Sequence, residues 1–213
     1  MRHTIIFDLD DTLYPPSTGI WDRISARIYD YMIRKVGIAE NEAEQTRRHY
    51  FTTYGTTMRG LMIHHHIDPE EYLTYVHEPS LGQFITANQQ LRSMLLNLPQ
   101  RKIIFTNANR PHAERILKGL GVEDLFHTII DIMDVQPFCK PMNEAFQIAL
   151  QKIEAVPQES IFIDDSIHNL DEAKALGLLT IQPNATKTEI TSPHIKLASL
   201  LDLPAVLSKL SAQ

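Results

Sequence analysis

The sequence predicts an α/β protein, a Rossmann-like doubly wound parallel sheet with a helical insertion after its first strand. Two observations predict this fold. Short continuous apolar runs at 5–7, 102–105 and 160–163 are typical of strands that are buried on both faces. From about Ile85 onward such runs alternate with amphipathic helical patterns, which is the order expected of a parallel sheet covered by helices.

The residues between Tyr14 and about Gln83 show no convincing strand pattern. Gly37 is placed to end a first helix, and Asp68 followed by a proline is a typical helix start with the aspartate as N-cap. Helices are expected over 20–36, 39–54 and 57–66, and from 68 onward. We interpret 15–83 as a helical cap domain, and 1–14 together with 84–213 as the α/β core domain.

The core domain is expected to continue as alternating helices and strands. Pro99 ends one amphipathic helix, and Gly121 ends the next, which opens at Arg110. Regularly spaced leucines predict a last helix near the C-terminus. The expected order is helix 89–98, strand 102–105, helix 110–121, strand 126–132, a helix starting at Pro141, strand 160–163, a helix capped by Gly177, strand 178–181 and helix 195–210.

Composition indicates a globular protein and argues against several classes. The 213 residues are 43% hydrophobic, which is enough for a sizeable core. A net charge of -6 and a pI near 5.9 argue against binding to polymeric nucleic acid or to a membrane surface, because such proteins usually present a basic face. No apolar run reaches the roughly 18 residues that a membrane-spanning helix needs. Residues 1–4 leave no room for a signal peptide, and Cys139 is the single cysteine, so we expect a cytoplasmic protein.

Carboxylates and other reactive groups stand where the strands are expected to end. Asp8 and Asp10 follow the first strand, and ligands of open α/β sheets bind at the carboxyl ends of the strands. Two carboxylates this close repel each other unless a cation neutralises them, and Mg²⁺ is the obvious candidate because it prefers oxygen ligands. The same edge is expected to collect residues from three further elements: Thr106, Asn107, Lys140, Asp164 and Asp165.

This collection of groups fits the hydrolysis of a phosphate monoester. Asp8 is expected to attack phosphorus and form an aspartyl-phosphate. Asp10 would protonate the leaving oxygen and later deprotonate the attacking water. Thr106, Asn107 and Lys140 would bind the phosphoryl oxygens.

A Mg²⁺ ion held by Asp8 and Asp165 would neutralise the carboxylate and phosphate charges, and Asp164 would act through a water ligand. The expected partner is a small phosphorylated metabolite.

Five segments carry a resemblance to a known family: Asp8–Tyr14, Tyr54–Leu61, Phe105–Ala108, Cys139–Pro141 and Asp164–Ser166. In residue type, order and context they resemble the haloacid dehalogenase superfamily, and most of all its pyrimidine 5'-nucleotidase branch. The resemblance implies a C1-type cap, a Mg²⁺ ligand in the backbone carbonyl of Asp10, and a pyrimidine nucleoside 5'-monophosphate as substrate. In that branch Asn often stands where this chain has Asp11, which is expected to take no part in the chemistry.

Other functions share part of this pattern. A dehalogenase would use Asp8 on carbon and would not need Asp10. A phosphatase of phosphoglycolate or of a sugar phosphate would use the same core groups, as would a sugar phosphomutase, so only turnover separates these alternatives. A phospho-receiver signalling module also accepts phosphate on an aspartate, but it is shorter and lacks a long helical block after its first strand.

Residues of the expected cap carry weaker signals. Arg59 is the best candidate for a substrate contact, because it lies in a segment that resembles the nucleotidase branch. His64, His65 and His66 are adjacent on a helix, so their side chains point in different directions and are not expected to share a metal ion. Trp21 and the cap tyrosines are expected in the cap core.

Overall fold

The computed structural model of the chain describes residues 2–190 and 194–211 and confirms the expected α/β class. Six parallel strands form one sheet in the order β3-β2-β1-β4-β5-β6. The strands are β1 (Thr4–Phe7), β2 (Arg101–Phe105), β3 (Thr128–Ile130), β4 (Ser160–Ile163), β5 (Leu179–Gln182) and β6 (Ile195–Lys196). The central position of β1 places the acidic segment after it in the middle of the sheet edge. Of the predicted core domain, Met1, 191–193 and 212–213 lie outside the described residues.

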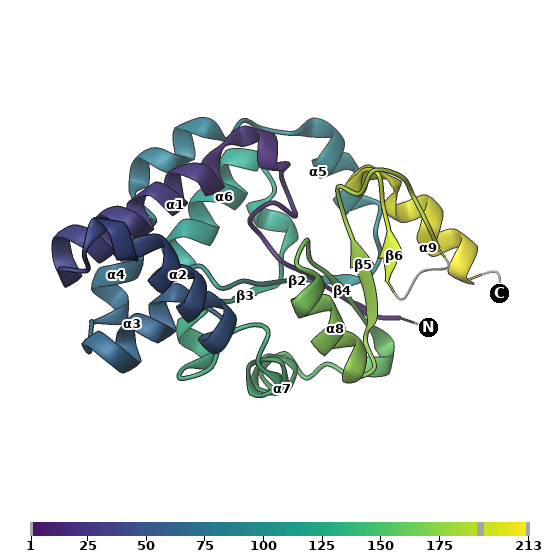
Figure 1. Ribbon diagram of the computed structural model, residues 1–213. Helices are drawn as coiled ribbons and strands as arrows, with labels where there is room; N and C mark the ends of the chain where they lie inside the picture. Colours follow the sequence, from purple (N-terminus) through teal and green to yellow (C-terminus); the bar gives the residue numbers. More distant parts are fainter. Residues whose placement is uncertain (1, 191–193, 212–213) are drawn as a thin grey trace.

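Helices cover both faces of the sheet (Figure 1). On one face lie α5 (Gln89–Leu96) and α6 (Arg110–Leu120), and on the other lie α7 (Asn143–Lys152) and α8 (Ile167–Ala175). Side chains of a strand point alternately to the two faces, so Ile5 and Phe7 join one buried cluster while Ile6 joins the other. Both faces of β1 are therefore buried, as expected from its apolar sequence.

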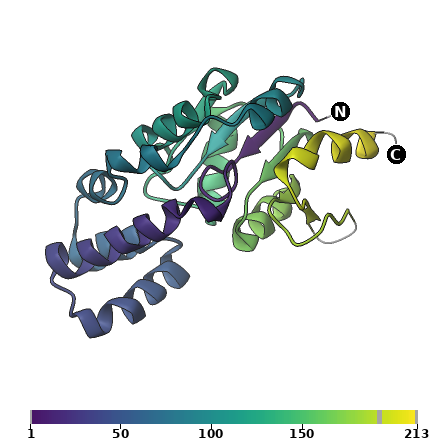
Figure 2. The same cartoon turned by 90° about the horizontal axis from the view of Figure 1, so that it is seen from above.

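Between β1 and α5 the described chain forms helices and no strand. The α-helices among them are α1 (Ile20–Tyr31), which continues as a π-helical turn to Val36, α2 (Glu40–Tyr54), α3 (Thr57–His65) and α4 (Pro69–Val76). Asp68 caps α4 as expected, because its carboxylate accepts a hydrogen bond from the Glu71 N–H at 2.7 Å. Figure 2 shows α1 to α4 gathered at one side of the molecule. The division into a cap of 15–83 and a core of 1–14 and 84–213 stays a prediction.

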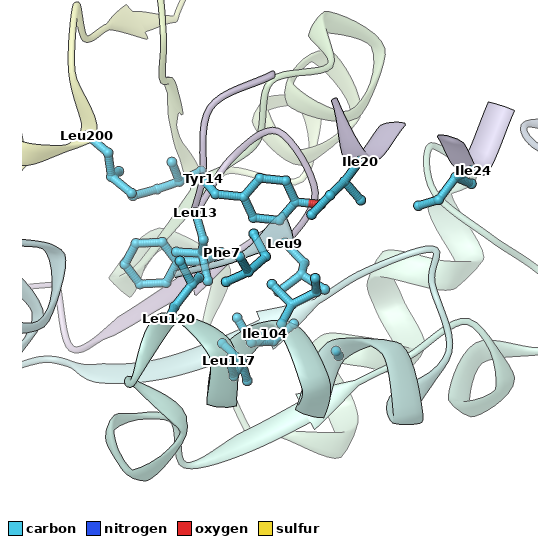
Figure 3. Packing of buried hydrophobic residues seen from close by; sticks show 14 of the residues in the cluster. Phe7, Leu9, Leu13, Tyr14, Ile20, Ile24, Ile104, Leu117, Leu120 and Leu200 are labelled. Carbon is cyan, nitrogen blue, oxygen red and sulfur yellow. The ribbon is translucent and has the colours of Figure 1, made fainter. Parts of the chain in front are cut away.

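Apolar packing anchors the chain that leaves β1. Leu9, Leu13 and Tyr14 are buried, and they pack with residues of β2, α1 and α6 (Figure 3). The polar residues Asp8 and Asp10 alternate with these anchors. The anchors therefore hold the two carboxylates at the edge of the sheet.

Several element boundaries differ from the sequence-based expectations. The helix expected over 195–210 is wrong in its first half: α9 (Leu203–Ser211) starts later, and Ile195 instead pairs with Ile181 in the short strand β6. The strand expected over 126–132 has three residues, and α7 begins at Asn143 and not at Pro141. Every described helix is too short or too polar to cross a membrane.

Candidate active site

A cavity of about 990 Å³ lies at the carboxyl edge of the sheet. The inserted helices contribute side chains of α1 to α4 to its lining, and the strand ends contribute the polar residues named from the sequence. All of the expected site residues line it: Asp8, Asp10, Arg59, Thr106, Asn107, Lys140, Asp164 and Asp165. The fold thus gathers into one place residues that are far apart in the sequence.

Lys140 is the centre of the charged cluster. Only 1% of its surface is exposed, and its Nζ donates to Asp8 Oδ1 at 2.7 Å, to Asp164 Oδ2 at 2.8 Å and to the Phe105 carbonyl at 2.8 Å. These contacts use all three donors of the ammonium group. Burial lowers the pKa of a lysine, but the carboxylates of Asp164 and Asp8 outweigh this effect, so the pKa of Lys140 is raised. Lys140 is therefore a fixed cation beside Asp8.

Asp164 is fully buried, and both of its oxygens are already occupied. Oδ1 accepts from the Ser166 N–H at 2.8 Å, and the Asn169 amide donates to Oδ1 at 3.0 Å and to Oδ2 at 2.9 Å. The Lys140 ammonium takes the remaining place on Oδ2. This geometry makes Asp164 the residue that holds Lys140, and it leaves Asp165 as the more accessible carboxylate of the pair.

Asp8, Asp164 and Asp165 form a carboxylate cluster that fits Mg²⁺. One oxygen of each lies within 4.8 Å of the others. The Thr12 hydroxyl fixes Asp165, since it accepts from the Asp165 N–H at 3.2 Å and donates to Oδ1 at 3.3 Å. Burial and the charge of Asp164 raise the pKa of Asp165 to about 6 against the opposing effect of Lys140. An all-oxygen set with excess negative charge is the chemistry that a hard divalent cation prefers.

Asp10 is held by two donors on one oxygen. His112 Nε2 lies 2.8 Å from Asp10 Oδ1, and the Tyr14 hydroxyl donates to the same atom. Burial would raise the pKa of Asp10, but the His112 and Tyr14 contacts outweigh it and lower this pKa to about 2. In the absence of a ligand Asp10 is therefore a carboxylate with one oxygen engaged.

Thr106 and Asn107 order the loop that faces the cavity after β2. Thr106 is buried, and its hydroxyl accepts a hydrogen bond from the Ala108 N–H at 3.0 Å. The Asn107 amide donates to the Lys140 carbonyl at 2.9 Å, and Asn107 Oδ1 accepts from the Lys140 N–H at 2.9 Å. The side chain of Asn107 thus fixes the backbone that carries Lys140. A hydroxyl donates as well as accepts, so Thr106 keeps a donor for an anion.

Comparison with protein families identifies the family to which the chain belongs. The model of the family described as haloacid dehalogenase-like hydrolase matches residues 3–177. The chain belongs to this hydrolase family. Family membership confirms the superfamily that the motifs indicated and argues against the phospho-receiver alternative.

Individual relatives of this hydrolase agree with that assignment. Phosphate metabolism protein 8 of Saccharomyces cerevisiae is 30% identical over 192 residues, which cover 83% of this chain but only 60% of the yeast protein. CbbY from Rhodobacter sphaeroides, solved in complex with phosphate, has a TM-score of 0.68 at 18% identity and covers 98% of this chain and 100% of its own. YfnB from Bacillus subtilis, solved bound to magnesium, has a TM-score of 0.65 at 18% identity with the same coverage. At these identities the two structures show the shared fold.

Two residues of the inserted helices, Arg59 and Trp21, line the cavity. Arg59 lines the cavity, but its guanidinium also contacts the Met142 thioether on the loop after Lys140. Trp21 is 42% exposed and lines the cavity, so the expectation that it is a core residue is wrong. It lies in the first turn of α1.

The three adjacent histidines of this hydrolase have separate environments. The Tyr54 hydroxyl lies 2.7 Å from His64 Nε2, and the Tyr50 hydroxyl lies 3.0 Å from His65 Nε2. His66 ends α3 with a φ of 53°. Among the described residues, the carboxylate cluster is the group whose geometry could hold a metal, and the histidines are not part of it.

The backbone conformation at Asp11 favours an aspartate or an asparagine at this position. Its φ is 57°, in the left-handed region that Asn and Asp tolerate better than most residues. Its carbonyl accepts from the Asn184 amide at 2.9 Å. Burial and the charges of Asp165 and Asp10 raise the pKa of Asp11 to about 6. Asp11 thus shapes the turn after β1, and its charge is poorly compensated there.

The sequence interpretation missed His112, Tyr14 and Asn169 as parts of this site. Each contacts an acidic residue at the edge of the sheet. The signal for His112 was weak, since a lone histidine on the inner face of a helix is usually a core residue. Asn169 was hidden for a similar reason, because it lies on α8 among apolar positions.

Mg²⁺ should stabilise this hydrolase more at pH 7.5 than at pH 5. The metal-free pKa of Asp165 is about 6, above its ordinary 3.8, so the ionised carboxylate costs stability increasingly from pH 4 to above pH 6. Mg²⁺ would bind that ionised form and offset the cost. At 100 times its Kd it should add about 2.7 kcal/mol, a rise in Tm of roughly 5–10 °C at pH 7.5, and clearly less at pH 5.

Differential scanning fluorimetry with EDTA or Mg²⁺ measures both increments. In Asp165→Asn the metal-free Tm at pH 7.5 should rise and the Mg²⁺ increment should shrink. An increment that is equal at the two pH values, or unchanged in this variant, would contradict the assignment of Asp165.

Proposed function

We propose that the chain is a Mg²⁺-dependent phosphomonoester hydrolase that works through an aspartyl-phosphate, with pyrimidine nucleoside 5'-monophosphates as substrates. One observation carries the proposal. Asp8 Oδ1 accepts a hydrogen bond from Lys140 Nζ at 2.7 Å, and Asp8, Asp10 and Lys140 all line a cavity of about 990 Å³. A nucleophile, a proton carrier and a fixed cation are thereby together where a phosphate can enter.

In the first step of the proposed reaction, an oxygen of Asp8 forms a bond to phosphorus as the ester P–O bond breaks. Asp10 gives its proton to the departing oxygen. In the second step, a water oxygen bonds to phosphorus, Asp10 takes a proton from that water, and the bond between phosphorus and Asp8 breaks. The negative charge of the arriving phosphate raises the low pKa of Asp10, which favours the protonated form that the first step needs.

In this proposal Thr106 and the loop at Asn107 bind the phosphoryl oxygens, and Lys140 binds them by exchanging one of its three present contacts for a phosphoryl oxygen. Asp8, Asp165 and the Asp10 carbonyl would hold Mg²⁺, with Asp164 acting through water, and the bound ion supplies positive charge to the phosphoryl group. Lys140 already neutralises part of the cluster and holds Asp8 in place.

Two observations support a large leaving group. The cavity is much larger than a phosphate group, and its lining includes aromatic residues, among them the exposed side chains of Trp21 and Phe51. Aromatic faces of this kind suit a planar base. The pyrimidine preference itself rests on the motif resemblance.

The cytoplasmic location stays a prediction.

The test is release of inorganic phosphate from a panel of substrates with Mg²⁺ or with EDTA. The panel contains UMP, CMP, AMP, GMP, phosphoglycolate, glucose 6-phosphate and glucose 1-phosphate. We expect Mg²⁺-dependent release that is fastest with UMP or CMP. Fastest release from phosphoglycolate or a sugar phosphate would overturn the nucleotide assignment alone. Interconversion of the glucose phosphates with little free phosphate would indicate a mutase, and activity on none of them would overturn the proposal.

Binding of UMP should change the fluorescence of this protein, because Trp21 is its single tryptophan and lines the cavity. With Asp8→Asn to prevent turnover, titration of UMP in Mg²⁺ should give a saturable change in emission. Phosphoglycolate has the phosphate but no base and should give a much smaller change. If calorimetry shows that UMP binds while the emission stays constant, the base does not lie near Trp21.

A further inference from the structure

The strongest unassigned arrangement is the group of residues around Asp10. His112 is fully buried on α6, and its Nε2 lies 2.8 Å from Asp10 Oδ1. Tyr14 is 3% exposed, and its hydroxyl donates to the same oxygen while its ring packs in the apolar cluster (Figure 3). Two side chains from different parts of the fold thus converge on one atom of one carboxylate.

The contacts fix the orientation of the Asp10 side chain. A carboxylate that follows a strand end is free to rotate about two side-chain bonds unless something holds it. Here both donors engage Oδ1, and Asp10 also lines the cavity. Among the described residues no side chain engages the other oxygen, Oδ2, so this oxygen remains available to a ligand. Fixing a proton carrier in this way removes an entropic cost from the reaction.

His112 is itself held in place from two sides. The Asn109 side-chain oxygen, at the start of α6, accepts a hydrogen bond from the backbone N–H of His112 at 3.3 Å. The ring of His77 stacks on the ring of His112 with 4.5 Å between centroids and an interplanar angle of 25°. His77 ends α4 of the inserted helices, and its carbonyl accepts from Arg115 at 2.6 Å. The last inserted helix is therefore tied to the residue that orients Asp10.

We infer that His112 and Tyr14 are positioning residues for Asp10, which they orient so that its free oxygen transfers the proton to the leaving group. The inference rests on the proposed function. It concerns the step in which the ester P–O bond breaks and the proton of Asp10 goes to the departing oxygen. A leaving group that departs readily as an anion needs this proton little, and an alkoxide needs it most.

The test compares two substrates in the same variants. One is the alkyl phosphate that the wild type hydrolyses fastest in the panel, and the other is p-nitrophenyl phosphate. The quantity is kcat/KM, because it reports the steps up to departure of the leaving group. In His112→Ala we expect a loss of about 100-fold with the alkyl substrate and less than about 10-fold with p-nitrophenyl phosphate.

Further variants separate positioning from stability. His112→Gln carries an amide that reaches the same oxygen and should restore much of the alkyl activity. Tyr14→Phe keeps the packed ring and loses only the hydroxyl, so it should show the same substrate dependence even if His112→Ala fails to fold. Leu117→Ala, at a buried position on the same helix, should lower the Tm while changing the two kcat/KM values by the same factor.

Equal losses with both substrates in Tyr14→Phe, and in His112→Ala if that variant folds, would overturn the inference. A wild type that hydrolyses neither substrate would instead overturn the proposed function. The two failures are therefore distinguishable.

Discussion

Asp8→Asn should lower kcat/KM for phosphate monoesters by about 1,000-fold or more while leaving the fold intact. The amide has the shape of the carboxylate, but it cannot act as the nucleophile. Burial and the charges of Asp164 and Asp165 raise the pKa of Asp8 well above its ordinary value, despite the opposing Lys140. The ionised Asp8 therefore costs the metal-free fold stability at neutral pH, so the neutral amide should not lower the metal-free Tm.

A matched control is the same change at a neighbouring position. Asp11→Asn also replaces a carboxylate by an amide in the turn after β1, and Asn tolerates the φ of 57° there. Its activity should stay within about threefold of the wild type, since its charge has no part in the proposed steps. If both variants lost activity equally, or if Asp8→Asn stayed active, Asp8 would not be the nucleophile.

Lys140→Met should lower the free energy of unfolding by about 3–5 kcal/mol and reduce kcat/KM at least about 100-fold. The lysine is 1% exposed and pairs with Asp8 and with the fully buried Asp164. Removing the cation leaves buried carboxylates that repel each other, and their burial limits the hydration that could compensate their charges. Urea denaturation with EDTA measures the loss in stability.

A double variant tests the physical reason for that loss. Lys140→Met with Asp164→Asn removes the cation and one of its anions, so part of the lost stability should return while the activity does not. The metal-free single variant should also be more stable at pH 5 than at pH 7.5, because protonation neutralises the orphaned carboxylates. A single variant as stable as the wild type would show that the ion pairs contribute little.

The sequence predicted the parts of this site that depend on strand ends. Asp8 and Asp165 come after apolar runs, and Lys140 stands immediately before a proline; these local signals are strong. Parallel strands bring the ends of such runs together whatever the details of packing. The same reasoning failed for β6, because two residues are too few to show a strand pattern. Its apolar residues are also spaced as in the helix that follows.

The parts that the sequence did not predict depend on contacts between distant residues. His112 and Asp10 are separated by 102 positions, and only the packing of α6 beside the turn after β1 brings their side chains together. Trp21 was misassigned because its apolar character favours burial, whereas its place on α1 faces the cavity. Asn107 was expected to bind phosphate, and the reciprocal pair that its side chain forms with the Lys140 backbone could not be foreseen from residue type.

The central claim is that phosphate passes through Asp8. The most direct measurement is acid quench during turnover of the best substrate, followed by borohydride reduction and peptide mass spectrometry, since reduction converts an aspartyl-phosphate to homoserine. The account predicts homoserine at position 8 in the wild type and none in Asp8→Asn. Steady phosphate release with unmodified Asp8 at every quench time, or homoserine at another aspartate, would contradict it.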